Sequence, residues 1–149
     1  MPETVTYQMA ESSDIKLKKN SVILCIDDDP FVLQMLSIQL NELLKGTGIL
    51  IEFLTDPTLA VGKVEQLQAD GFDVKLILTD YVMPKMTGYE LIYALRIKYQ
   101  DLRCILLSGQ ADKFETRELL ELRMISCFID KPWTLKDMRI ALQNVNILQ

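Results

Sequence analysis

The chain has 149 residues, of which 49% are hydrophobic and 25% charged, and its formal net charge is -5. This length and composition predict one globular domain with a full core, not two small ones. No window approaches the ~18 consecutive apolar residues of a membrane span, and the N-terminus lacks a secretory signal pattern, so we expect a cytoplasmic protein without membrane contacts. The negative charge argues against direct nucleic-acid binding, because neutralising phosphates needs clustered lysine and arginine.

The cysteines and the missing histidine exclude further classes. Cys25, Cys104 and Cys127 each lie within a short apolar run, which is typical of buried free thiols. Without any histidine and without a CxxC pair, the chain has no means of building a structural zinc site or of histidine-based catalysis.

Apolar strand patterns alternate with helical patterns after a polar start. Residues 1–20 show no sustained period and predict a loosely ordered extension, so the domain is expected over 21–149. Strands are expected at 21–26, 49–54, 74–79, 104–108 and 126–130. Helices are expected at about 30–44, 59–67, 88–99, 112–122 and 134–146. Such alternation predicts an α/β fold, a flavodoxin-like doubly wound parallel sheet of five strands in the order 2-1-3-4-5 with five surrounding helices.

Polar residues follow four of the expected strands, at the edge where ligands gather in such sheets. These residues are Asp27, Asp28 and Asp29 after the first strand, Asp80 after the third, Ser108 at the end of the fourth and Lys131 after the fifth. Each one alone is explained equally well as a helix cap, a turn residue or a solvated charge. Together they place several carboxylates on one rim, which is tolerable only if protons or a cation compensate their charge.

Oxygen ligands of this kind indicate Mg²⁺, or Mn²⁺, together with a phosphate group. A carboxylate can attack phosphorus when the charge of the incoming phosphoryl group is neutralised. Lys131 would supply a positive charge to one phosphoryl oxygen, and Ser108 a hydrogen bond to another.

Four blocks then resemble the signature of the response-regulator receiver domain of two-component signalling. The blocks are "VILCIDDDP", "LILTDYVMPKMTGYEL", "LLSGQ" and "FIDKPW". Their order and spacing are more specific than any single short motif, and the resemblance spans residues from about 21 to 146.

The resemblance implies a role for each matching residue. Asp80 would be the phospho-acceptor, Asp28 a direct metal ligand and Asp27 an acid that reaches the metal through water. Val82 would offer its backbone carbonyl to the metal, and Lys131 would be the site lysine. Ser108 and Phe128 would be the switch hydroxyl and the switch aromatic, and the Lys131-Pro132 bond is expected to be cis.

The resemblance also implies partners and a switch. A sensor histidine kinase or a histidine phosphotransfer protein would phosphorylate Asp80, and the change would reach the face of the fourth helix, fifth strand and fifth helix, over about 111–146. Such a protein is not a conventional enzyme, although it catalyses its own phosphorylation and dephosphorylation. The output would be a downstream protein target or an output domain missing from this chain, and both alternatives stay open.

Two other hypotheses remain. A haloacid dehalogenase-like phosphatase could use Asp27 and Asp29, with Ser108 and Lys131 on later strands, but it leaves Asp80 unexplained and lacks an acidic pair after the lysine. A pseudo-receiver would bind partners without phosphorylation. The segment "LRMISCF" lacks the small Gly-Ala pair often seen before the switch aromatic, and Trp133 is expected to pack at the start of the last helix.

Overall fold

The structure is a computed structural model, and it describes residues 20–149. The extension expected at residues 1–20 therefore lies outside the described residues, except for Asn20, which begins the first strand. Within the described part, no helix has both the length and the apolar character needed to cross a membrane.

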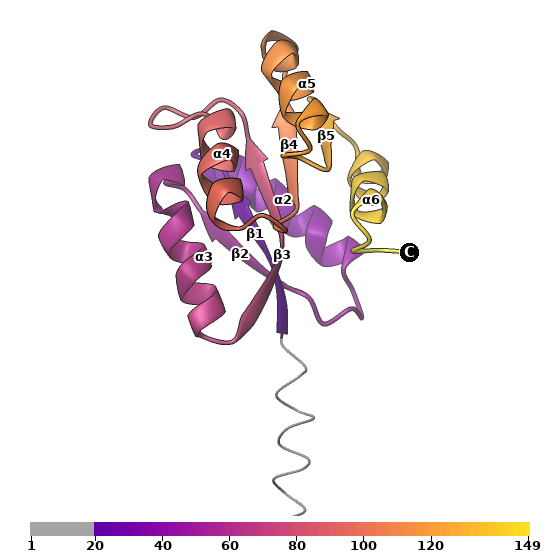
Figure 1. The fold of residues 1–149 in the computed structure, drawn as a ribbon. Helices are drawn as coiled ribbons and strands as arrows, with labels where there is room; N and C mark the ends of the chain where they lie inside the picture. The colour runs from indigo at the N-terminus through magenta and orange to yellow at the C-terminus, as the bar shows by residue number, and fades with distance from the viewer. Residues whose placement is uncertain (1–19) are drawn as a thin grey trace, which may run out of the picture.

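Strands and helices alternate along the described chain (Figure 1). The strands are β1 (Asn20–Ile26), β2 (Leu50–Leu54), β3 (Phe72–Asp80), β4 (Cys104–Ser108) and β5 (Cys127–Asp130). The α-helices are α2 (Pro30–Leu43), α3 (Ala60–Ala69), α4 (Gly88–Lys98), α5 (Lys113–Glu121) and α6 (Leu135–Asn144). Two short 3₁₀ turns, η1 (Pro57–Leu59) and η2 (Gln110–Asp112), lead into α3 and α5.

The strands form one parallel sheet in the order β2-β1-β3-β4-β5, which confirms the expected fold. Parallel strands need crossover connections, and the helices supply them. The register places Asp80 opposite Leu107 and places Ser108 opposite Asp130. The C-terminal ends of β3, β4 and β5 therefore meet at one edge of the sheet.

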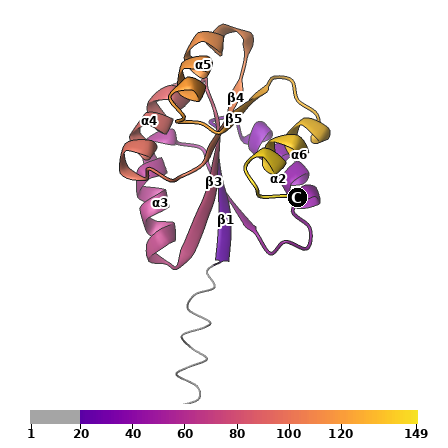
Figure 2. The ribbon, with the colours of Figure 1, turned by 45° about the vertical axis from the view of Figure 1, so that its right-hand side comes forward.

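Helices cover both faces of the sheet, as Figure 2 shows with the sheet nearly edge-on: α3, α4 and α5 lie on one side, and α2 and α6 on the other. Each side has its own buried cluster. Leu24 and Ile26 of β1 belong to the α3–α5 side, whereas Ile23 and Cys25 belong to the α2–α6 side. This alternation is the period of two that a strand buried on both faces requires.

Several element boundaries differ from the sequence-based expectation. β3 begins at Phe72 instead of residue 74, because Phe72 and Asp73 pair with Asn20 and Ser21 of β1. The helix expected from residue 59 is preceded by η1, whose N-cap Asp56 accepts a hydrogen bond from the Thr58 amide at 3.0 Å. The last helix ends at Asn144, earlier than expected.

Two local predictions are confirmed. Thr134 and Asp137 form a capping box at the start of α6, with the Asp137 amide donating to Thr134 Oγ1 at 3.1 Å. Cys25, Cys104 and Cys127 are free thiols as expected, and the first two are fully buried, whereas Cys127 is half-buried. Burial raises the pKa of Cys104 to about 12 and that of Cys127 to about 11.

Candidate functional site

Three aspartates come together at the C-terminal edge of β1 and β3. Asp27, Asp28 and Asp80 each offer a carboxylate oxygen, and these oxygens all lie within 4.8 Å of one another. Asp27 is 1% exposed and Asp80 is 6% exposed, whereas Asp28 is exposed. Two negative charges are therefore held out of water beside a third, an arrangement that calls for a compensating positive charge.

Asp27 has an incomplete set of hydrogen bonds. Its Oδ1 accepts a bond from the Asp29 amide at 2.9 Å, but its buried Oδ2 has no partner among the described residues. Burial raises the pKa of Asp27 to about 6, and the nearby charges of Asp80 and Asp28 push it in the same direction. A buried carboxylate oxygen without a partner needs an explanation, and an ion or a water molecule that completes its bonds is the usual one.

Asp80 is the last residue of β3, and its carboxylate is held by two donors. Oδ1 accepts a hydrogen bond from the Tyr81 amide at 2.9 Å and an ion-pair contact from Lys131 Nζ. Lys131 follows β5, and its amide donates to the Ser108 carbonyl at 3.0 Å, which ties the lysine to the end of β4. The Lys131-Pro132 peptide bond is cis, as the resemblance implies.

The donor set fits a hard divalent cation. Magnesium prefers oxygen ligands and takes only one or two carboxylates with several waters. Asp27, Asp28 and Asp80 could hold such an ion, and the free Oδ2 of Asp27 is an acceptor that it would satisfy. Val82 follows Asp80 by two residues and is exposed. The assignment of the Val82 carbonyl as a ligand stays a prediction.

The loop after Asp80 returns closely to the end of β3. The Gly88 amide donates to the Tyr81 carbonyl at 2.7 Å. A Cβ atom at Gly88 would lie 2.5 Å from the Asp80 carbonyl oxygen and 2.9 Å from the Tyr81 Cα, closer than real Cβ atoms approach. Thr87 and Glu90 then form a capping box that starts α4. Gly88 thus allows α4 to begin directly against the residue that carries the candidate nucleophile.

Ser108 ends β4, as expected, but its hydroxyl is engaged with α5. Ser108 Oγ lies 2.9 Å from Oγ1 of Thr116, and both residues are 0% exposed. The next residue, Gly109, donates its amide to the buried carboxylate of Asp112 at 2.9 Å. The structure therefore connects the end of β4 to the first turns of α5.

Phe128 lies on β5, half-buried, and packs against the α3–α5 cluster. Lys113 Nζ lies 4.8 Å from the centre of the Phe128 ring and also contacts the Asp130 carboxylate. A cation at this distance over an aromatic face is attracted by the ring quadrupole. Lys113 thereby links α5 to β5 beside the predicted switch aromatic.

Two further predicted residues have structural roles. Asp29 is the N-cap of α2, and its exposed carboxylate accepts a hydrogen bond from the Phe31 amide at 2.9 Å. Trp133 packs on the α2–α6 cluster as expected, and its Nε1 donates to Gln39 Oε1 at 2.7 Å.

Sequence reasoning missed Thr116, Asp112 and Lys113. None of the three carried a signal in the local sequence, because their contacts depend on how α5 and the turn before it pack against the ends of β4 and β5.

The chain matches known proteins over almost all of the described part. A family model described as "Response regulator receiver domain" matches residues 23–143. The chain is 33% identical over 75 residues to a "Chemotaxis protein CheY homolog" of Campylobacter jejuni, which covers 49% of this chain and 57% of that protein. It is 30% identical over 144 residues to "Sensor protein EvgS" of Escherichia coli, covering 97% of this chain and 11% of that protein. The chain thus spans about half of the first relative and a small part of the second.

Solved structures agree with the fold. A response regulator receiver domain protein from Clostridium thermocellum superposes with a TM-score of 0.71 at 22% identity, covering 84% of this chain and 93% of that one. The signal receiver domain of an HD domain-containing protein from Pseudomonas fluorescens superposes with a TM-score of 0.68 at 26% identity, covering 87% of this chain and 96% of that one.

Proposed function

Because this chain belongs to the response regulator receiver domain family, we propose that it accepts a phosphoryl group on Asp80 and uses the modification as a signal. The observation that carries the proposal is the buried Asp80 carboxylate, which pairs with Lys131 beside the acids Asp27 and Asp28. The domain that carries this function is proposed to span residues 21–149.

The phosphoryl donor is a phosphohistidine of a sensor histidine kinase or histidine phosphotransfer protein. An Asp80 carboxylate oxygen attacks phosphorus, the P–N bond breaks, and its electron pair returns to the donor ring, which leaves as neutral imidazole if its other nitrogen carries a proton. Lys131 Nζ contacts Asp80 Oδ1 and is placed to balance charge on a phosphoryl oxygen. Asp28, Asp80 and the Val82 carbonyl would hold a Mg²⁺ or Mn²⁺ ion directly and Asp27 would hold it through water, and such an ion would neutralise further charge.

The response to phosphorylation involves Ser108 and Phe128, which lie on neighbouring strands beside α5. Their movement would alter the surface of α5, β5 and α6, which corresponds to the face predicted over 111–146. A groove of about 330 Å³ on this surface is lined by residues of β5 and α6, among them Phe128 and Ile140. The partner on this face is a downstream protein target or an output domain of a longer chain, and a cytoplasmic location stays a prediction.

The proposal is tested by intact mass after incubation with acetyl phosphate and Mg²⁺. We expect one phosphoryl adduct in the wild type and none in Asp80→Asn, because the amide is not a nucleophile toward phosphorus. Thr79→Ser, at the preceding residue of β3, keeps a hydroxyl and serves as the matched control that retains the adduct.

The same experiment separates the alternatives. Sustained phosphate release that survives Asp80→Asn but is lost in Asp27→Asn would favour the phosphatase, although Asp29, its second acid, acts as a helix cap. Absence of an adduct in the wild type would favour the pseudo-receiver.

The lifetime of the phosphoryl group is a second part of the proposal. In dephosphorylation, water attacks phosphorus and the bond to the Asp80 oxygen breaks, releasing phosphate. Val82 and Gln110, which are both exposed, flank the path of this water in the receiver family, and the apolar Val82 side chain cannot orient it. We expect slow dephosphorylation that Val82→Asn changes measurably; an unchanged rate would contradict this part.

A further inference from the structure

The hydroxyl that the proposed switch would bring to the phosphoryl group is bonded elsewhere. Ser108 Oγ lies 2.9 Å from Thr116 Oγ1 and 3.3 Å from its neighbour's carbonyl oxygen, on Gly109. Ser108 and Thr116 are both 0% exposed, so water does not compete for their bond. A buried hydroxyl that leaves such a partner must find another one of equal quality, since an unpaired buried polar group is costly.

Strand alternation separates this hydroxyl from the acceptor. Successive side chains of a strand point to opposite faces. Ser108 shares its face with Leu106, on the side covered by α3, α4 and α5, whereas Asp80 shares its face with Leu78, on the α2–α6 side. The Ser108 hydroxyl therefore has to change its direction before it can donate to a group on Asp80.

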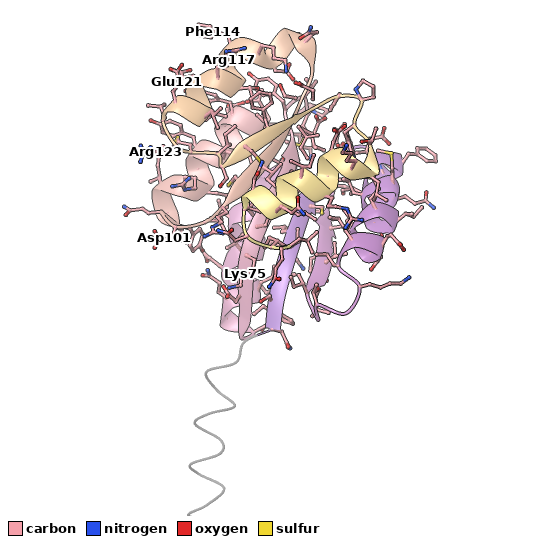
Figure 3. The ribbon with its side chains drawn as sticks, turned by 90° about the vertical axis from the view of Figure 1, so that its right-hand side faces the viewer. Lys75, Asp101, Phe114, Arg117, Glu121 and Arg123 are labelled. Carbon is pink, nitrogen blue, oxygen red and sulfur yellow. The ribbon has the colours of Figure 1, made fainter. Side chains whose placement is uncertain are left out.

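Thr116 is held firmly at the other end of the bond. Figure 3 shows Phe114, Arg117 and Glu121 on the outward side of α5, and all three are exposed. Thr116 lies on the opposite side of this helix with Leu119, and both are 0% exposed. The Thr116 hydroxyl is thus presented to Ser108 by a packed helical face, not by a mobile surface side chain.

We propose that Thr116 is a positioning residue that holds the Ser108 hydroxyl away from Asp80 in the unphosphorylated protein, and thereby limits how readily Asp80 is phosphorylated. The inference rests on the proposed function and adds a residue that opposes the reaction. The phosphorylated state gains the Ser108 donor only by giving up its bond to Thr116. One net hydrogen bond corresponds to about a two- to tenfold change in the balance between the two states.

The test compares two substitutions at one position. Thr116→Val keeps the shape and removes the hydroxyl, whereas Thr116→Ser keeps the hydroxyl and removes the methyl group. We expect the rate of acetyl phosphate-dependent adduct formation, followed by intact mass with Mg²⁺, to rise about two- to tenfold in Thr116→Val. The rate in Thr116→Ser should stay near the wild-type rate, because the bond to Ser108 can still form.

A second background shows whether the effect passes through Ser108. In Ser108→Ala, the added Thr116→Val substitution should leave the rate unchanged, because no hydroxyl remains to be released. Circular dichroism checks folding, and Thr116→Ala replaces Thr116→Val if the latter does not fold.

Three results would overturn the inference. Adduct formation in Thr116→Val that is no faster than in the wild type would contradict it directly. If Thr116→Val accelerates adduct formation equally in the wild-type and Ser108→Ala backgrounds, the substitution acts by destabilising α5 and not through the Ser108 hydroxyl. A wild type that forms no adduct would overturn the proposed function and this inference together, whereas an adduct formed at unchanged rates overturns only the inference.

Discussion

Asp27 carries its charge where water scarcely reaches it, and this has a cost in the metal-free protein. The residue is 1% exposed, and burial raises the pKa of its carboxyl group from 3.8 to about 6. Each tenfold change in proton affinity is worth about 1.4 kcal/mol. We expect Asp27→Asn to increase the free energy of unfolding by about 1–3 kcal/mol at pH 8 with EDTA, measured by urea titration.

The stability gained by Asp27→Asn should depend on pH. The folded protein binds the Asp27 proton more tightly than the unfolded chain, so the wild type loses stability as pH rises from about 4 to about 6. Asp27→Asn cannot titrate there, so its advantage should be full above pH 6 and vanish below pH 4. Asp28→Asn, at the exposed neighbour, is the control and should give a smaller gain. An equal gain at pH 4 and pH 8 would contradict the role of burial.

At the scale of residues, the acids and the lysine could be predicted because each directly follows an apolar strand. Asp27, Asp80 and Lys131 needed only the strand ends and the strand order to be placed together. Thr116 could not be predicted in the same way, because its contact with Ser108 depends on the rotation and depth of α5 against the sheet. Spacing along one helix carries no information about that packing.

At the scale of elements, Gly88 fixes how closely α4 follows β3. A Cβ there would meet backbone atoms of Asp80 and Tyr81 at 2.5 and 2.9 Å, and backbone cannot yield as a flexible side chain can. We expect Gly88→Ala to lower the free energy of unfolding by about 1–3 kcal/mol, the usual cost of overpacking, as measured by urea titration. It should also slow the phosphorylation of Asp80.

Gly62 provides the matched control. It lies within α3, and a Cβ there would meet nothing within 4 Å. Gly62→Ala should therefore stabilise the protein by roughly 0.5–1 kcal/mol, since alanine restricts the unfolded chain and favours the helix. Equal effects of the two substitutions would contradict the close approach at Gly88.

The start of α6 makes a smaller contribution that can be measured separately. Thr134 Oγ1 accepts from the Asp137 amide at 3.1 Å, and Asp137 Oδ2 accepts from the Thr134 amide at 2.9 Å. Thr134→Ala removes the cap and should cost about 1 kcal/mol in urea unfolding, whereas Thr134→Ser should cost little. A similar loss of stability in Thr134→Ala and Thr134→Ser would show that the threonine methyl group, and not the cap, stabilises the start of α6.

Elements were predictable where hydrophobic period and caps agreed, as in α2, α4 and α6. The start of β3 was missed because Asp73 interrupts the apolar run. Asp73 forms an exposed ion pair with Lys75 at 2.9 Å, and the backbone pairing of Phe72 and Asp73 with β1 extends the strand past this polar residue. Pairing of this kind depends on a neighbouring strand and is invisible in the local sequence.

At the scale of the whole molecule, the sheet order predicts which amides exchange most slowly. β1, β3 and β4 have hydrogen-bonded neighbours on both sides, whereas β2 and β5 are edge strands. We expect hydrogen exchange, followed by mass spectrometry, to be slowest in the three central strands, because opening them requires global unfolding. Equally slow exchange in β2 would contradict this gradient.

The overall architecture was the most predictable level. Alternating strands and helices leave few arrangements for a parallel sheet, since crossover connections are right-handed and cover both faces. The convergence of Asp80, Ser108 and Lys131 at one edge follows from this order. The sequence did not show that Asp80 faces the layer of α2 and α6 whereas Ser108 faces the layer of α3, α4 and α5. This assignment depends on the strand register and became known only from the structure.

The contact between Trp133 and Gln39 gives the protein a built-in optical probe. Trp133 is the chain's sole tryptophan, and it follows Lys131 by two residues. Its indole Nε1 donates a hydrogen bond to Oε1 of Gln39 on α2 at 2.7 Å. Any ligand that draws Lys131 away from Asp80 acts close to this fluorophore. Emission from a single unlabelled chromophore could therefore follow metal binding and phosphorylation in real time, with Gln39→Ala as the variant that shifts the baseline spectrum.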